Sequence, residues 1–213
     1  VELYTAVLAH QPDHPVAKKA LRKLQKGQPQ NQSSEEEASN PPQEQITALV
    51  NLFNAGQMTE TEQACRELLQ QYPQSSIVIN ALGGALLGQG KLQEAVENFD
   101  KAIRFEPDYA DTYSNRGVVL EQLGKPVEAI ESFDKAIQLK PDYPEAYYNR
   151  GIALGALGLL DEAVESYDKA IQFKPDYADA YNNRGIALEQ LGQPDEALKS
   201  FDKATQLKPD SAL

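Results

Sequence analysis

Three asparagines, Asn115, Asn149 and Asn183, recur at an interval of 34 residues, and each is followed by Arg and Gly. A carboxamide offers both a hydrogen-bond donor and an acceptor, so an evenly spaced row of them could bind the backbone of an extended peptide without reading its side chains. Two plainer interpretations stay open: the amides keep a polar surface soluble, or each one only hydrogen-bonds the arginine that follows it. The chemistry that these residues indicate is binding.

Catalysis has little support in the residue inventory. His10 and His14 are the only histidines, and Pro12 between them prevents the helical i, i+4 pair that a metal site would use. Carboxylates are plentiful, but they recur in register with the repeat, as in Glu94, Glu128, Glu162 and Glu196. A catalytic pair instead needs one special environment that separates two pKa values. Because a Gly-rich phosphate loop and a nucleophile motif are also missing from the sequence, we expect no enzyme activity, no cofactor and no metal site.

The elements that must position these side chains follow the same period. Tyr-Ser-Asn-Arg-Gly at 113–117 returns as Tyr-Tyr-Asn-Arg-Gly at 147–151 and as Tyr-Asn-Asn-Arg-Gly at 181–185. An aromatic residue followed by Asp-Lys-Ala recurs in the same way, beginning at Phe99, Phe133, Tyr167 and Phe201. A fixed period of this length predicts a stack of small helical units and not a single globular core.

In the unit 110–143 the recurring positions are Tyr113, Arg116-Gly117, Ala129, Phe133, Ala136 and Pro141. This pattern resembles the tetratricopeptide repeat, a helix-turn-helix unit present in many bacterial proteins and in the repeat region of O-linked N-acetylglucosamine transferases. The resemblance implies an all-α fold, an α-solenoid of stacked antiparallel helix pairs that forms a right-handed superhelix. Arg116 and its copies depart from the family pattern, which usually has leucine there, and make that helix face more polar.

The chain divides into three segments. Residues 1–26 are interpreted as a partial leading repeat and a basic helix, and residues 27–41, rich in Gln, Asn, Ser and Pro, as a polar linker. The repeat array is predicted over 42–213, with the units 42–75, 76–109, 110–143, 144–177 and 178–211. Because the chain starts and stops within a repeat, we expect a fragment of a longer protein or a degenerate leading unit.

Local signals predict how each unit is built. Gly90 and its copies are expected to close the first helix in a left-handed conformation, and Pro126 and Pro194 to lie in the first turn of the second helix. Asp108 and its copies are expected to cap the next unit. Cys65 stands where other units have an aromatic residue such as Phe99 or Phe133, so we expect a buried packing residue and not a reactive thiol.

In this family the first helices line a concave groove, and the resemblance places a set of side chains there. Unit by unit they are Asp111, Ser114, Asn115, Val118 and Glu121, then Glu145, Tyr148, Asn149 and Ile152, then Asp179, Asn182, Asn183, Ile186 and Glu189. The asparagines among them look like the asparagine ladder of the O-linked N-acetylglucosamine transferases. Repeats that clamp the acidic tails of heat-shock chaperones have Lys and Arg in such positions, so we expect a neutral or basic partner and not an acidic one.

Composition limits the partners further. The chain has 20 Lys and Arg against 32 Asp and Glu, a net charge of −12, which disfavours nucleic acid and anionic membranes. The sequence contains no run of about 18 apolar residues and nothing that resembles a signal peptide. The single cysteine fits a reducing compartment, so we expect a cytoplasmic protein.

Together these observations predict a non-catalytic scaffold that binds a protein or an extended peptide on the concave face of the superhelix. The alternative is a substrate-presenting or assembly segment of a larger enzyme, such as a glycosyltransferase or sulfotransferase with leading repeats. A third interpretation is self-association through uncapped terminal repeats.

Overall fold

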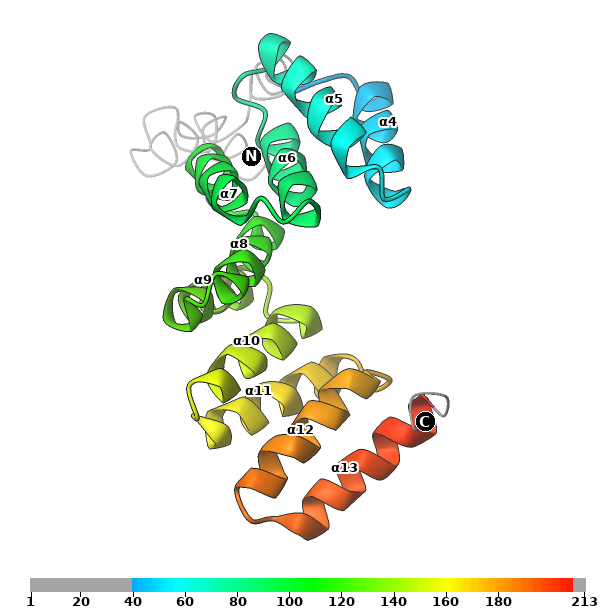
Figure 1. Ribbon diagram of the computed structural model, residues 1–213, viewed down its shortest axis with the longest axis vertical. Coiled ribbons are helices and arrows are strands. Elements are labelled where there is room, and N and C mark those ends of the chain that lie inside the picture. Colours follow the sequence, from blue (N-terminus) through cyan, green and yellow to red (C-terminus); the bar gives the residue numbers. More distant parts are fainter. Residues whose placement is uncertain (1–39, 209–213) are drawn as a thin grey trace, which may run out of the picture.

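The computed structural model of the chain describes residues 40–208 (Figure 1). Within this range the chain forms ten α-helices and no strand. The helices are α4 (Gln43–Asn54), α5 (Met58–Gln71), α6 (Ser76–Gly88), α7 (Leu92–Phe105), α8 (Ala110–Gln122), α9 (Pro126–Leu139), α10 (Pro144–Ala156), α11 (Leu160–Phe173), α12 (Ala178–Gln190) and α13 (Pro194–Leu207). The predicted segment 1–26 and most of the predicted linker 27–41 lie outside the described residues.

Consecutive helices pack as pairs, and each pair falls within one of the predicted 34-residue units. We call α4, α6, α8, α10 and α12 the first helices, and α5, α7, α9, α11 and α13 the second helices. The second helices α5, α7, α9 and α11 also pack against the first helix of the next pair, so the pairs stack into an elongated array (Figure 1). The predicted all-α solenoid is confirmed.

The two sets of helices lie on different sides of the stack. First helices of neighbouring pairs contact one another, as α8 does with α10. Over residues 40–208 no Cα atom of a second helix lies within 8 Å of a Cα atom in the second helix of a neighbouring pair. The first helices are therefore crowded on the inner side of a curved stack, while the second helices spread apart on the outer side. We call the surface formed by the first helices the inner face.

Glycines close the first helices as predicted. Gly56, Gly90, Gly124, Gly158 and Gly192 all have φ between 70° and 74°, a left-handed conformation that costs glycine little. At one such turn the amide of Lys91 donates to the carbonyl of Leu86 at 2.9 Å and pulls the chain back over the helix end. Pro126 and Pro194 occupy the first turn of α9 and α13, as expected.

The predicted aspartate caps are wrong. The helices begin at Ala110, Pro144 and Ala178, and the capping positions hold Tyr109, Tyr143 and Tyr177, whose side chains make no capping hydrogen bond. Asp108, Asp142 and Asp176 lie one residue too early for the carboxylate to occupy the capping position. Over residues 40–208 the one side-chain cap is at α6, where Ser75 Oγ accepts from the amide of Val78 at 3.4 Å.

Small residues set the distance between the two helices of a pair. A Cβ atom added to Gly117 would lie 2.5 Å from Cε1 of the Phe133 ring, so the ring packs directly on the backbone of α8. The same contact recurs between Gly151 and Tyr167. Because this approach has no room for a methyl group, the glycine fixes how close first and second helices lie.

The cysteine is buried, as predicted. Cys65 has none of its surface exposed and belongs to a core that includes Leu49, Val78 and Leu82. Burial, with the negative charge of Glu62 adding to it, raises the pKa of the thiol to about 12. The thiolate that reactive cysteines require is therefore disfavoured at neutral pH.

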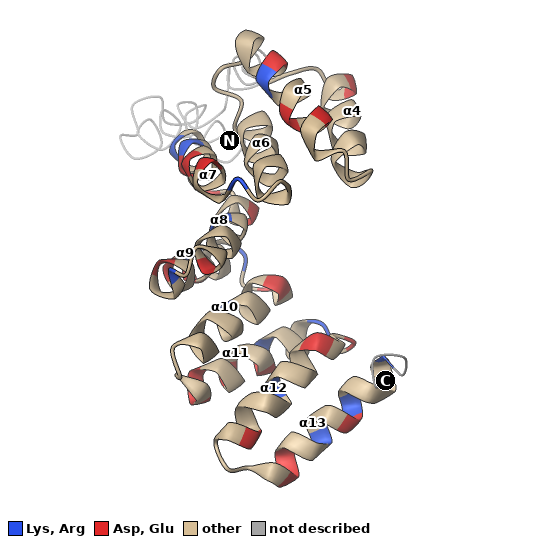
Figure 2. Cartoon of the chain, viewed as in Figure 1, with Lys and Arg blue, Asp and Glu red and all other residues tan. Residues whose placement is uncertain are grey.

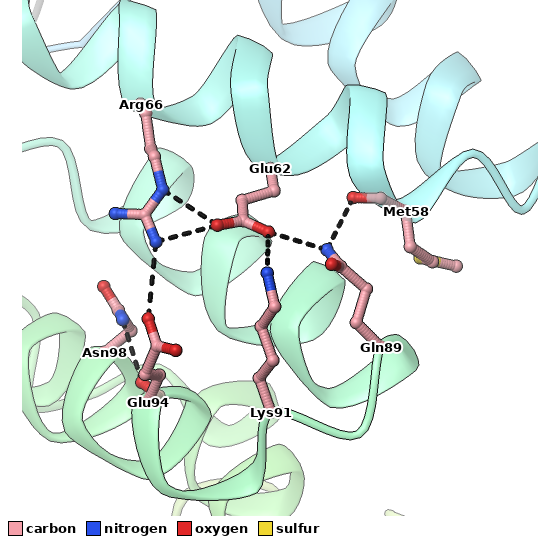
Figure 3. Close-up of polar contacts among 7 residues, drawn as sticks. All are labelled: Met58, Glu62, Arg66, Gln89, Lys91, Glu94 and Asn98. Carbon is pink, nitrogen blue, oxygen red and sulfur yellow. Dashed lines mark hydrogen bonds and ion pairs between the residues drawn. The ribbon is translucent and has the colours of Figure 1, made fainter.

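A polar cluster around Glu62 joins the first pair to the second (Figure 3). The carboxylate of Glu62, on α5, accepts from Lys91 Nζ at 2.7 Å and from Gln89 Nε2 at 2.9 Å, both in the turn between α6 and α7. Arg66, one turn along α5, donates to it at 2.9 Å. Lys91, then Arg66 and Gln89, lower the pKa of Glu62 from 4.5 to about 2. One period later the position of Glu62 holds Val96, so this contact between pairs is polar where the next has an apolar side chain.

Among residues 40–208, none of the helices combines the length and the apolar character that crossing a bilayer requires.

Candidate functional site on the inner face

The predicted groove residues all lie on three first helices. Asp111 to Glu121 belong to α8, Glu145 to Ile152 to α10, and Asp179 to Glu189 to α12. Most of these side chains are partly or fully exposed, with Asp179, Asn182, Ile186 and Glu189 the most open. Ser114 is the exception, because it is buried with 4% of its surface exposed. The structure therefore brings the set together on the inner face, with Ser114 beneath the surface.

The asparagines at the two ends of the row, Asn115 and Asn183, have different surroundings. Asn183 Nδ2 on α12 donates to the hydroxyl of Tyr148 on α10 at 3.2 Å, so this amide already links two first helices. Asn115 borders a pocket between α6 and α8, and Asn183 borders another between α10 and α12. A partner that lay along the row would contact Asn115 beside the pocket between α6 and α8, and Asn183 beside the pocket between α10 and α12.

The arginine after each asparagine has other partners. Arg116 Nε donates to Asp100 of α7 at 2.6 Å, and its Nη1 donates to Ser132 of α9 at 2.7 Å. The hydroxyl of Ser132 in turn donates to the carbonyl of Glu128 at 2.9 Å. The guanidinium thus connects the second helices of two neighbouring pairs, and among residues 40–208 it makes no hydrogen bond to the Asn115 side chain.

The same bridge is built three times along the stack. Its later copies are Asp134–Arg150–Ser166 and Asp168–Arg184–Ser200, with distances within 0.1 Å of the first. From the sequence, the arginines were expected to make one helix face more polar or to be hydrogen-bond partners of the asparagines, and this bridge was not predicted. The missed signal was the spacing, because Asp, Arg and Ser follow one another at 16-residue steps in each period.

The acidic side chains at the start of the first helices are partly neutralised. Glu145 lies 3.5 Å from Lys174, and Asp179 lies 2.8 Å from Lys208. Over residues 40–208, Asp111 has no cation within ion-pair distance. Burial, with the negative charge of Asp111 adding to it, raises the pKa of Tyr109 and Tyr143. Among these three carboxylates, the negative charge is therefore least compensated at Asp111.

Tyrosines line the inner face between the helices. The ring of Tyr148 lies 4.8 Å from that of Tyr177 and 6.1 Å from that of Tyr167, measured between centroids. The ammonium groups of Lys140 and Lys174 lie over the rings of Tyr143 and Tyr177, 4.3 and 4.5 Å from the ring centroids. At this distance the ring face attracts the cation. Burial raises the pKa of Tyr143 to about 12, so these phenols stay neutral and can act as donors.

A pocket of about 260 Å³ lies further along the inner face, where α4, α6 and α8 meet. We call it the apolar pocket, and it is lined by Leu49, Val50, Phe53, Ile77, Asn80, Ala81, Gly84, Tyr109 and Asn115. Of these residues only Asn115 was predicted, because groove positions were assigned only from the unit 110–143 onward and not in the units 42–75 and 76–109. A usable signal was Ile77, which stands one period before Asp111.

What the inner face can do chemically follows from these groups. It offers amides, phenols and carboxylates around small apolar pockets, which suits non-covalent binding of a chain segment. Over residues 40–208 no group of His, Cys, Asp and Glu side chains is arranged to hold a metal ion.

Comparison with known proteins agrees with the repeat pattern. The family model described as TPR repeat matches residues 83–124, 126–158 and 156–192, and the one described as tetratricopeptide repeat matches 178–211. No curated protein sequence gives a significant match.

Several solved structures are similar to the described array. A crystal structure of MamA is 28% identical, with a TM-score of 0.69, over 76% of this chain and 95% of that one. MamA from residue 41 onward of Desulfovibrio magneticus RS-1 is 20% identical, with a TM-score of 0.70, over 79% and 98%. YrrB, described as a TPR protein with an unusual peptide-binding site, is 24% identical, with a TM-score of 0.65, over 84% and 91%. The family models that match more than half of its length show that the chain belongs to the tetratricopeptide repeat family.

Proposed function

We propose that the chain is a non-catalytic scaffold that holds a segment of a partner protein along the inner face of the solenoid. The observation that supports this proposal most directly is the row of first-helix side chains on α8, α10 and α12, in which an asparagine recurs on each helix. Amides at a fixed interval match a partner that presents its own backbone donors and acceptors at intervals. The backbone would supply affinity, and the residues between the amides would supply selectivity.

The charge of this surface favours neutral or basic partners. The predicted groove positions include Asp111, Glu121 and Glu189 and contain no Lys or Arg. An acidic segment would meet like charge there, whereas a basic one would be attracted. Ion pairs with Lys174 and Lys208 reduce the effect toward α12, so we expect the preference to be strongest near α8.

The similarity to YrrB supports the same proposal. That protein is described as having an unusual peptide-binding site, and the two chains share the fold. The proposal does not require this chain to use the same residues, since its own groove positions differ along the stack.

The test is affinity capture from a cell lysate, followed by quantitative mass spectrometry. Three forms of the full chain serve as bait: the unmodified chain, the triple variant Asn115→Ala, Asn149→Ala, Asn183→Ala, and a control. The control is Gln138→Ala, Gln172→Ala, Gln206→Ala, which removes exposed amides at the same 34-residue interval from the second helices. Circular dichroism and thermal unfolding first establish that all three are equally folded.

Proteins captured by the unmodified chain and by the glutamine variant, but lost with the asparagine variant, are the expected result. Equal capture by all three baits would contradict the proposal, because binding would then not use the inner face. Loss with the glutamine variant alone would move the binding site to the outer side of the stack.

A further inference from the structure

We propose that the apolar pocket is a specificity site that takes one bulky apolar side chain of the partner, from a segment with Lys or Arg beside that side chain. The proposal rests on the proposed function, because it adds a sequence requirement to a segment held on the inner face. It assigns binding to α4 and α6, which the predicted groove residues do not include.

Exposed apolar side chains surround the pocket. Val50 and Phe53 on α4 are 48% and 37% exposed, and Ile77 and Tyr109 are each 40% exposed. A cluster of exposed apolar residues on a soluble protein commonly marks a contact site. The volume of about 260 Å³ is ample for one ring or branched side chain, since a cavity of about 150 Å³ suffices for benzene.

The hollow exists because this part of the stack lacks side chains that the next unit has. Ala81 stands one period before Asn115, and Gly84 one period before Val118. Ile77 likewise stands one period before Asp111, so a carboxylate is replaced by an alkyl group. Helix α6 carries no charged residue at all (Figure 2). The same helix positions therefore form an apolar recess here and a polar surface later in the stack.

The walls of the recess are defined by close contacts. A Cβ atom added to Gly84 would lie 3.0 Å from Cε2 of Phe53, so the ring rests on the backbone of α6 and forms one side. Asn80 lines the pocket, and its buried Oδ1 has no hydrogen-bond partner among residues 40–208. An unpaired amide oxygen favours a ligand that brings an N–H, such as a peptide backbone.

The charge beside the pocket selects the residue next to the apolar one. Tyr109 and Asn115 line the pocket, and Asp111 lies between them in the sequence, in the first turn of α8. Among residues 40–208, no cation forms an ion pair with Asp111. A Lys or Arg adjacent to the anchoring side chain could reach this carboxylate, whereas Asp or Glu would be repelled. The complementary segment is therefore apolar and basic together.

The test begins with selection from a displayed library of random dodecapeptides on the immobilised full chain. We expect enrichment of Phe, Leu, Ile or Met next to Lys or Arg. A fluorescein-labelled selected peptide is then titrated by anisotropy against the chain. Replacing its apolar residue with Ala should raise Kd about 10-fold or more, the effect of losing one buried apolar side chain.

Variants of the chain locate the site. The double variant Ala81→Asn, Gly84→Val introduces the residues that the next unit carries, and it should raise Kd about 10-fold. Asp111→Asn should raise Kd about 2- to 5-fold, with a weaker salt dependence, as for an exposed ion pair. The control Leu198→Asn removes an apolar residue that is 60% exposed on α13, and it should leave Kd unchanged.

Each contrary result has a distinct meaning. Enrichment of acidic or purely polar peptides, no enrichment, or equal binding by the double variant would overturn the specificity site. The asparagine triple variant then shows whether the proposed function is also wrong. If this variant binds the selected peptide normally, both the specificity site and the proposed function are contradicted. If it loses binding, only the specificity site is contradicted. Should sedimentation show a dimer that the double variant dissociates, the occupant is a second copy of the chain and this proposal is wrong.

Discussion

At the scale of single residues, one missing methyl group controls the packing of a pair. Gly117 contacts the Phe133 ring with no space for a Cβ atom, whereas Gly155, also on a first helix, has no heavy atom within 4 Å of an added Cβ. Both glycines lie in regular helix. Replacing each of them with alanine should therefore distinguish the free-energy cost of glycine in a helix from the contribution of glycine to close packing.

Gly117→Ala should lower the free energy of unfolding by about 1 to 3 kcal/mol, because the overpacked ring must shift. Gly155→Ala should raise it by about 0.5 to 1 kcal/mol, because alanine favours helix and meets no neighbour. Urea unfolding followed by circular dichroism measures both. Equal effects of the same sign in the two variants would show that the ring contact does not constrain this helix pair.

At the scale of elements, two different devices hold neighbouring pairs together. The repeated Asp–Arg–Ser bridge ties α7, α9 and α11 each to the next pair through one guanidinium. The Glu62 cluster does so once, between α5 and the turn before α7 (Figure 3). Both are side-chain contacts between residues far apart in sequence, so each sets how one pair sits on the next.

Removal of one Asp–Arg–Ser bridge should destabilise the junction between two helix pairs. Arg150→Ala leaves Asp134 and Ser166 without their shared donor and should cost about 1 to 2 kcal/mol, since the guanidinium is largely buried and charge-assisted bonds are stronger than neutral ones. The control Arg104→Ala removes an exposed arginine from the last turn of α7 and should cost less than about 0.5 kcal/mol. Thermal unfolding compares the two, and equal losses would mean that the bridge contributes nothing specific.

The Glu62 cluster predicts an acid-sensitive junction. Because the folded-state pKa is lowered from 4.5 to about 2, the unfolded state binds the proton first. The stability from Glu62 is then fully present above pH 4.5 and is lost as the pH falls toward 2. After allowance for screening by solvent, it amounts to about 1 to 3 kcal/mol.

The variant Glu62→Gln should lose this stability at pH 7 and should show a correspondingly smaller loss between pH 4.5 and 2 than the unmodified chain. Glu62→Val combined with Gln89→Leu introduces the residues found one period later, Val96 and Leu123, and should restore stability at pH 7 without restoring the acid dependence. Urea unfolding across that pH range provides the measurement. An unchanged pH profile in Glu62→Gln would contradict the assignment.

At the scale of the whole molecule, residues 40–208 form a one-dimensional stack in which each helix pair contacts only the neighbouring pairs within this range. The inner face therefore changes character along its length without changing the fold. It is apolar and uncharged at α6, and polar with partly neutralised carboxylates at α10 and α12 (Figure 2). A partner that spans the stack would contact both the apolar surface at α6 and the polar surface at α10 and α12.

The sequence was sufficient where a feature is local and repeated. The period predicted the helix pairs, Gly90 predicted the left-handed turn, and the position of Cys65 predicted its burial. The aspartate caps failed because the helices begin one residue later than the caps require, so that the capping position falls on Tyr109 and its copies. The arginine bridges, the Glu62 cluster and the apolar pocket depend on contacts between units, and the pocket also depends on side chains that are absent, at Ala81 and Gly84.

The most direct measurement is the response of the asparagine side-chain amides to a bound segment, observed by NMR on the nitrogen-15-labelled chain during titration with the selected dodecapeptide. The side-chain amide signals of Asn115, Asn149 and Asn183, assigned by substitution, should shift as the peptide binds, while those of Gln138, Gln172 and Gln206 stay in place. Shifts confined to the glutamines of the second helices would show that the partner lies on the outer side of the stack and would contradict binding on the inner face.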